Sequence, residues 1–139
     1  MKQFKKSLTV TTLIASMVLM SGVLFSCGEG AREQARQERL AEVKADVEQE
    51  LSKFKTNIND RIRYLDEQIE EASGETEENL KEARAGLVEQ RDRLDAELER
   101  VRAAEMDEWN EVVSEVSVTL GQVRAKTNEI SREVREMLD

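Results

Sequence analysis

The sequence lacks several residue types on which functional sites often depend. Its 139 residues include no proline, no histidine, one cysteine and only 4 % aromatic residues. Without histidine there is no imidazole for acid–base catalysis, for a serine triad or for a metal site. One cysteine forms neither an internal disulfide nor a cysteine-type zinc site. The absence of proline and the 37 % of charged residues are instead typical of long helices.

The first 26 residues have the layout of a secretory signal peptide. Three lysines, Lys2, Lys5 and Lys6, precede an uncharged and mostly apolar run from Leu8 to Phe25. A basic start followed by a short apolar run is the order found in signal peptides. The run is at the lower length limit for a membrane-spanning helix, so a retained anchor helix is the alternative.

The end of this run favours the signal peptide. Leu24 stands three residues before Cys27 and the small residue Ser26 stands directly before it, with Phe25 between them. This order resembles the lipobox of bacterial lipoproteins, although that family usually has a small or β-branched residue at the position of Phe25. The resemblance implies cleavage between Ser26 and Cys27, and a mature N-terminal cysteine that carries diacylglycerol and usually an N-linked acyl chain such as palmitate. Two or three acyl chains anchor a protein stably, because each buried methylene contributes about 0.8 kcal/mol.

The residues after the cysteine indicate a short tether and a location. Residues 27–30 comprise the lipidated cysteine and a tether of three residues, and a helical domain over 31–139 follows. Gly28, rather than aspartate, follows Cys27, which by resemblance to the enterobacterial sorting rule favours the outer membrane. We therefore expect a lipid-anchored protein of the bacterial cell envelope that faces the periplasm.

The charge balance changes when the signal is removed. The signal contains three lysines and no acidic residue, so residues 27–139 carry 18 basic and 30 acidic residues, a net charge of −12 instead of −9. An acidic chain is a poor match for nucleic acid, which needs a basic face, and for anionic lipid headgroups. Arg91, Arg93, Arg100 and Arg102 are surrounded by acidic residues, which indicates a solvated helix face with ion pairs.

The apolar pattern of the mature region predicts an all-α fold. Between residues 40 and 69 the apolar residues fall in three eleven-residue units, with steps that follow the order 3-4-4. Helices with this period pack nearly straight or with a slight right-handed supercoil. The nine apolar positions are Leu40, Val43, Val47, Leu51, Phe54, Ile58, Ile62, Leu65 and Ile69.

The pattern stops at a segment that predicts a turn over residues 73–76. Gly74 can adopt the left-handed conformation that ends a helix, and Thr76 is a suitable N-cap for the next helix. The two predicted helices run from about residue 31 to 72 and from about 77 to 138. Together they predict a long antiparallel hairpin or coiled coil.

The second helix repeats the period less regularly. A heptad fits slightly better than the eleven-residue template after Trp109. A turn centred between residues 74 and 75 places Leu51 opposite Leu98. It also places Leu40 opposite Trp109. A strand over residues 112–123, where β-branched residues alternate with others, is the alternative for that segment. The polar residues at apolar positions of the template are Gln90, Glu105, Thr127 and Ser131.

The predicted second helix is longer than the first, so its end has no partner in a plain hairpin. Gly121 is the candidate point for a break or bend, because it lies where this helix returns to the level of Cys27 and glycine costs about 1 kcal/mol in a helix. Residues 122–139 then continue to another subunit, fold back as a third helix or lie on the bilayer. Their zero net charge favours packing on protein. Since a two-helix hairpin is marginally stable, we expect a homo-oligomer or a three-helix fold.

The sequence does not point to an enzyme, and we expect no catalytic residue, cofactor, metal or small-molecule substrate. The acidic pairs Glu70-Glu71 and Glu77-Glu78 lie on predicted helices without a cleft, so a solvated face explains them better than a catalytic site. The single tryptophan, Trp109, is expected in a core layer. A partner-docking anchor is the alternative for this residue.

Residues 40–120 also resemble a family of small bacterial coiled-coil proteins that is usually labelled a stress-response family. The resemblance rests on Ile69-Glu70-Glu71-Ala72-Ser73-Gly74-Glu75, Leu80-Lys81, Arg91-Asp92 and Glu108-Trp109. It implies an all-helical hairpin or bundle with a role in stress tolerance, and neither catalytic residues nor a defined ligand.

We therefore expect a membrane-anchored coiled-coil lipoprotein with a structural, scaffold or stress-response role. Its plan resembles that of the murein lipoprotein, which is attached to peptidoglycan through a C-terminal lysine. This chain ends in Met137-Leu138-Asp139, so any contact with peptidoglycan or an envelope protein would be non-covalent. The alternative is an apolipoprotein-like amphipathic lipid-binding protein, although such helices need a wide apolar face and usually contain proline.

Overall fold

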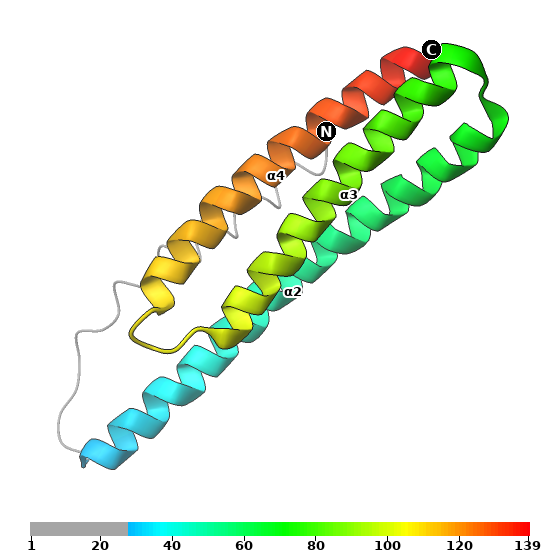
Figure 1. Cartoon of the computed structure of the whole chain (residues 1–139). Helices are drawn as coiled ribbons and strands as arrows, with labels where there is room; N and C mark the ends of the chain where they lie inside the picture. Colours follow the sequence, from blue (N-terminus) through cyan, green and yellow to red (C-terminus); the bar gives the residue numbers. More distant parts are fainter. Residues whose placement is uncertain (1–27) are drawn as a thin grey trace. The chain divides into compact units, whose positions relative to one another are not determined.

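The computed structural model describes residues 28–139, in which all regular structure is helical. The helices are α2 (Glu29–Glu71), α3 (Gly74–Ala103) and α4 (Trp109–Leu138). Residues Ala35–Asp139 form one compact unit, in which α3 runs antiparallel to both α2 and α4 (Figure 1). The predicted all-α class is confirmed. The strand considered for residues 112–123 was wrong, because that segment lies within α4.

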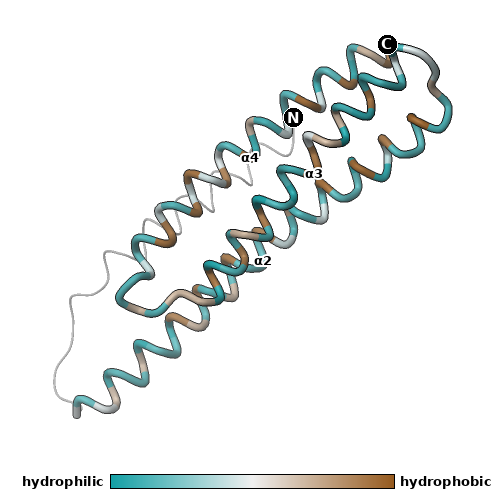
Figure 2. The backbone as a smooth tube through the Cα atoms, in the orientation of Figure 1, coloured by the Kyte–Doolittle hydropathy of each residue, from teal (hydrophilic) through white to brown (hydrophobic). Residues whose placement is uncertain are grey.

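The apolar residues of each helix recur at helical intervals, as Figure 2 shows for all three helices. On α2 the buried residues are Leu51, Ile58, Ile62 and Leu65. Steps of three and four residues return to the same side of a helix, so these side chains share one face. That face packs into a core shared with α3 and α4. The rest of the helix surface carries charged residues exposed to solvent.

The turn between α2 and α3 is shorter than the sequence predicted. Only Ala72 and Ser73 separate the two helices. Gly74 has a φ of +66°, the left-handed conformation expected of it, and this lets the chain reverse within two residues. The N-cap prediction for Thr76 was therefore wrong. Ser73 occupies the N-cap position, without a side-chain capping hydrogen bond, and Thr76 lies in the first turn of α3.

The single second helix predicted over residues 77–138 is two helices, and the break expected near Gly121 was wrong. Residues 104–108 form the loop between α3 and α4, whereas Gly121 lies inside α4. The N–H of Ala104 donates to the carbonyl oxygen of Arg100 at 3.0 Å and closes α3. The expected layer of Leu40 and Trp109 required a continuous helix, and α3 ends before Trp109.

The chain reverses direction at residues 104–108 because this buries the apolar side chains of α4. It turns α4 back onto the bundle as a third helix, one of the arrangements considered for the C-terminal segment. Burial of a large aliphatic side chain contributes about 1.5–3 kcal/mol, which outweighs the few helical hydrogen bonds missing from a five-residue loop. The buried residues of α4 are Val112, Val116, Val123, Thr127, Ile130 and Val134.

Helices α3 and α4 approach each other most closely. Among the described residues, Cα atoms of α3 and α4 come within 8 Å repeatedly, whereas α2 keeps a wider spacing. Small residues on α3 permit this approach: Ala83 is buried, and Gly86 lies against Ile130. A Cβ atom at Gly86 would lie 2.9 Å from Cδ1 of Ile130. The α3–α4 contact therefore depends on the missing side chain of Gly86.

Candidate functional site

Two of the residues singled out in the sequence, Ser26 and Cys27, lie outside the described residues. Signal cleavage and lipidation at these positions therefore stay predictions. Helix α2 begins at Glu29, so only Gly28 separates Cys27 from α2. In the described part of the chain, no helix is long and apolar enough to span a membrane.

Trp109 lies at the first residue of α4, at the end of the loop that follows α3. Its side chain is half-buried and packs against the hydrophobic core. Its backbone N–H donates to the carbonyl oxygen of Met106 at 3.3 Å, which helps to close the loop. The exposed residues of this loop include Glu105, Asp107 and Glu108, so the loop that precedes Trp109 has an acidic surface.

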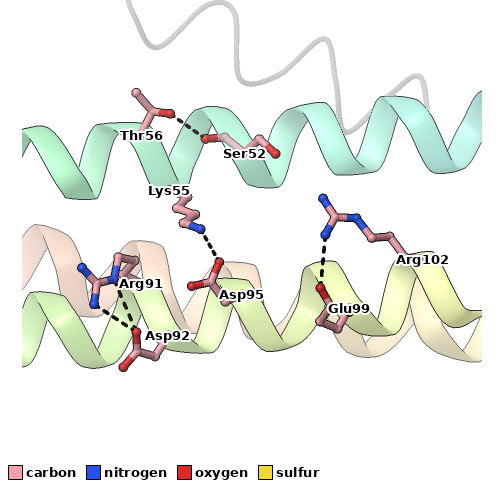
Figure 3. Close-up of polar contacts among 8 residues, drawn as sticks. All are labelled: Ser52, Lys55, Thr56, Arg91, Asp92, Asp95, Glu99 and Arg102. Atoms are coloured by element: carbon pink, nitrogen blue, oxygen red, sulfur yellow. Dashed lines mark hydrogen bonds and ion pairs between the residues drawn. The ribbon is translucent and has the colours of Figure 1, made fainter.

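Ion pairs connect α2 with α3 along their length. Lys55 Nζ lies 2.5 Å from Asp95 Oδ1, a contact drawn in Figure 3. Arg102 Nε lies 3.5 Å from Glu48 Oε2, and Arg84 pairs with Asp66. These side chains are partly exposed, so each pair contributes about 0.2–1 kcal/mol to stability. The pairs mainly fix the register between α2 and α3.

Helix α4 is connected to both other helices by polar contacts. Towards α3, Arg93 Nη2 donates to Gln122 Oε1 at 2.7 Å, and Arg100 pairs with Glu115. Towards α2, Arg124 lies 3.7 Å from Glu50, and its guanidinium carbon is 5.7 Å from the centre of the Phe54 ring. The second distance is within the range of a cation–π contact.

Within residues 28–139, three polar residues are buried among the apolar ones: Gln90, Glu97 and Thr127. Gln90 accepts a hydrogen bond from Arg93, and Glu97 Oε2 lies 3.4 Å from Arg100 Nη1. The hydroxyl of Thr127 is fully buried and has no hydrogen-bond partner among the described residues. Gln90 and Thr127 are two of the polar residues that stood at apolar positions of the sequence template.

Two lysines on the outer faces have raised pKa values. A hydrogen bond from Lys81 to Glu77, together with the charge of Glu77, raises the pKa of Lys81 above its ordinary value. Glu129 acts in the same way on the pKa of Lys126. Both pairs are local contacts between successive turns of one helix, of the kind that stabilises exposed helix surfaces.

A groove lies between α2 and α4 beside the C-terminal end of α4, with a volume of about 270 Å³. We call it the α2–α4 groove; α3 contributes one residue to its floor. The sequence did not predict it, because its lining combines residues that only the reversal at 104–108 brings together. The lining residues are Arg61, Tyr64, Leu65, Leu87, Ile130, Ser131, Val134, Arg135, Leu138 and Asp139.

The acidic side chains do not gather into a metal site. Across residues 28–139, no group of three or more cysteine, aspartate or glutamate side chains is placed to hold a metal ion. Glu70-Glu71 and Glu77-Glu78 flank the turn at Ala72 and Ser73, on an exposed end of the helices.

Comparison with known proteins finds no relative of this chain. No protein-family model, curated protein or solved structure matches the chain.

Proposed function

We propose that this chain is a lipid-anchored protein of the bacterial cell envelope with a non-catalytic structural, scaffold or stress-response role. The observation that carries the proposal is the position of the only cysteine. Cys27 directly follows an apolar run with a basic start, and helix α2 begins two residues after it. An acylated cysteine at that point would join the helical bundle to the membrane through a minimal tether.

Mass spectrometry of the protein purified from bacterial membranes tests the anchor. Cleavage at Cys27 followed by trypsin digestion gives an N-terminal fragment over residues 27–32. We expect this fragment to carry diacylglycerol on the Cys27 sulfur and an acyl chain on its amino group. The Cys27→Ser variant is the matched control and should keep its signal peptide. Recovery of an unmodified fragment from the membrane fraction would contradict the anchor.

The scaffold role is supported by the distribution of polar groups. Interhelical ion pairs such as Lys55–Asp95 and Arg102–Glu48 are spread over the bundle and not gathered at a reactive centre. We further propose that α2 packs in the manner of a coiled coil with an eleven-residue period, and that copies associate through their helices. The role in stress tolerance rests on the residue pattern of 40–120 alone, since no protein-family model matches the chain.

A photo-crosslinking amino acid at Ser73, which is exposed in the turn between α2 and α3, tests the partner. In intact cells, capture of a second copy would favour an oligomeric scaffold. Capture of a peptidoglycan-associated protein would favour a spacer between membrane and wall. Crosslinks only to cytoplasmic proteins would contradict an envelope location.

The second candidate function is an apolipoprotein-like lipid-binding protein, favoured by the regular amphipathic pattern of α2. A protein of that class would be mostly unfolded in buffer and become helical with vesicles. A self-packed bundle would be helical in buffer and melt cooperatively. Circular dichroism of residues 28–139 with and without vesicles separates the two, and we expect the self-packed result.

A further inference from the structure

The α2–α4 groove has an apolar floor and an apolar rim. Four buried side chains make the floor: Leu65 from α2, Leu87 from α3, and Ile130 and Val134 from α4. Tyr64 and Leu138 border the groove with 49 % and 36 % of their surface exposed. Within residues 28–139, the remaining large hydrophobic side chain with comparable exposure is Val118, which lies elsewhere on α4. Two of the three exposed large hydrophobic side chains of residues 28–139 therefore border this groove.

Two arginines flank this apolar surface without a carboxylate partner among the described residues. Arg61 Nε donates to Asn57 Oδ1 at 2.8 Å, and Arg61 Nη1 donates to the hydroxyl of Ser131. A guanidinium has five N–H donors, so Arg61 keeps donors for another acceptor. The Arg135 side chain has no hydrogen bond or ion pair within residues 28–139. Arg84 and Arg100, which also reach between helices, are each paired with a carboxylate.

The combination of an apolar floor and a fixed, unneutralised guanidinium matches an amphipathic anion. We propose that the α2–α4 groove binds a long-chain fatty acid, with its carboxylate at Arg61 and its alkyl chain along the floor. The carboxylate is ionised at neutral pH, because carboxyl pKa values lie near 4. A charge-assisted hydrogen bond to arginine is among the stronger polar contacts in proteins. The proposal does not depend on lipidation of Cys27.

The groove fits an alkyl chain better than a peptide. Its walls are helices, whose backbone groups are hydrogen-bonded up to the last turn of α4, so an extended peptide would find no continuous row of backbone partners there. The volume of about 270 Å³ is also slightly below the roughly 300 Å³ at which small-molecule pockets usually begin. A single alkyl chain that lies half-exposed between Tyr64 and Leu138 needs no backbone hydrogen bonds and fits a groove of this volume.

The end of α4 sets the direction of the ligand. Asp139 lies at the rim of the groove, and the C-terminal end of a helix carries a partial negative charge. Both repel an anion at the last turn of α4. The carboxylate therefore lies towards Arg61, and the alkyl chain runs towards Leu138. Ser131, which Arg61 contacts, precedes Asp139 by about two turns of α4. Arg61 is expected to matter more than Arg135.

Photoaffinity labelling tests the proposal with the full-length protein. Cells that express it are lysed, and a fatty acid carrying a diazirine and an alkyne is added to the whole lysate, so that membrane-bound and free protein are both present. After irradiation and trypsin digestion, we expect label on the fragments over residues 64–81 and 127–132, which contain Tyr64, Leu65, Ile130 and Ser131. Label on residues 103–124, which contain the exposed Val118, would indicate unspecific apolar contact and overturn the proposal.

Competition and variants separate anion recognition from apolar binding. Unlabelled oleate should compete at least 10-fold better than the uncharged alcohol of the same length, and equal competition would overturn the proposal.

Arg61→Gln should reduce labelling about 10-fold or more, and Asp139→Asn should increase it two- to three-fold. Arg132→Gln, an exposed arginine of α4 outside the groove, is the matched control. Helicity measured for each variant excludes a folding defect, and unchanged labelling in folded Arg61→Gln would contradict the assignment.

Discussion

Lys55 on α2 and Asp95 on α3 form an ion pair of 2.5 Å and stand at equal sequence distances from residue 75. The pairs Asp66–Arg84 and Glu48–Arg102 are symmetric about the same residue. Three pairs with one centre define a regular antiparallel hairpin without a shift in register. Since exposed ion pairs contribute little free energy, the apolar layers stabilise the hairpin and the charges select its register.

Replacement of Thr127 by valine should stabilise the protein. The buried Thr127 hydroxyl has no partner among the described residues, and valine has nearly the same shape without the polar group. A buried unsatisfied polar group costs about 1–3 kcal/mol, so we expect Thr127→Val to raise the free energy of unfolding by about 1 kcal/mol. Urea denaturation measures this. Thr76→Val at an exposed position is the control, and a loss of stability in Thr127→Val would show that the hydroxyl is needed.

The two glycines within α3 and α4 should respond differently to alanine. Nothing lies within 4 Å of a Cβ atom at Gly121, so Gly121→Ala should stabilise α4 by about 0.5–1 kcal/mol. At Gly86 the new Cβ atom would contact Ile130 at 2.9 Å, which offsets that gain. Adding Ile130→Val to Gly86→Ala removes the contacting Cδ1 atom, so the double variant should recover part of the difference. Equal stabilisation at both glycines would contradict the close α3–α4 approach.

Arg100 should contribute more to stability than its neighbour Arg102. Arg100 contacts Glu97, whose side chain is only 9 % exposed, and also pairs with Glu115 on α4. Its removal leaves Glu97 buried without its cation, so Arg100→Met should cost about 1–3 kcal/mol. Arg102→Met removes exposed pairs and should cost less than about 1 kcal/mol. Denaturant titration of both variants gives the comparison, and similar losses would argue against a special role for Glu97.

The pair of Glu77 and Lys81 should stabilise the fold up to alkaline pH. Because Glu77 raises the pKa of Lys81 above 10.5, the folded state holds this proton more tightly than the unfolded state. The contribution is therefore fully present below the ordinary lysine pKa and is lost as pH rises through the raised value. The Tm of the wild type should exceed that of Glu77→Gln at pH 7, and the difference should shrink above pH 10.5. A difference that grows with pH would contradict the assignment.

Periodicity located the apolar faces of the helices but not the reversal of the chain. Leu51, Ile58, Ile62 and Leu65 all came from the apolar pattern and are buried. The loop at residues 104–108 contains neither glycine nor proline, and alanine, glutamate and methionine favour helices, so local propensity concealed it. The burial gained by folding α4 back overrides that preference.

Two signals in the sequence did mark the reversal. Glu105 interrupts the apolar template, and the heptad fits better after Trp109, where α4 begins. Glycine is a weak helix former, which favours a break at Gly121, yet an isolated glycine inside a packed helix costs only about 1 kcal/mol. The α2–α4 groove could not be predicted, because its residues meet only after the reversal.

The distance between residues 93 and 122 tests the three-helix bundle most directly. The side chains of Arg93 and Gln122 are hydrogen-bonded at 2.7 Å, across the pair of α3 and α4. Spin labels on Arg93→Cys and Gln122→Cys, in a Cys27→Ser background and in buffer without lipid, report this distance by pulsed EPR. Dilution with unlabelled protein removes contributions from other copies.

A bundle that packs by itself predicts a short distance, set by the arms of the two labels. A continuous helix over these 29 residue steps would separate the labels by about 43 Å, at about 1.5 Å per residue. The short distance without lipid would support a self-packed bundle over both the simple hairpin and the lipid-dependent fold. A single population near 43 Å would contradict it.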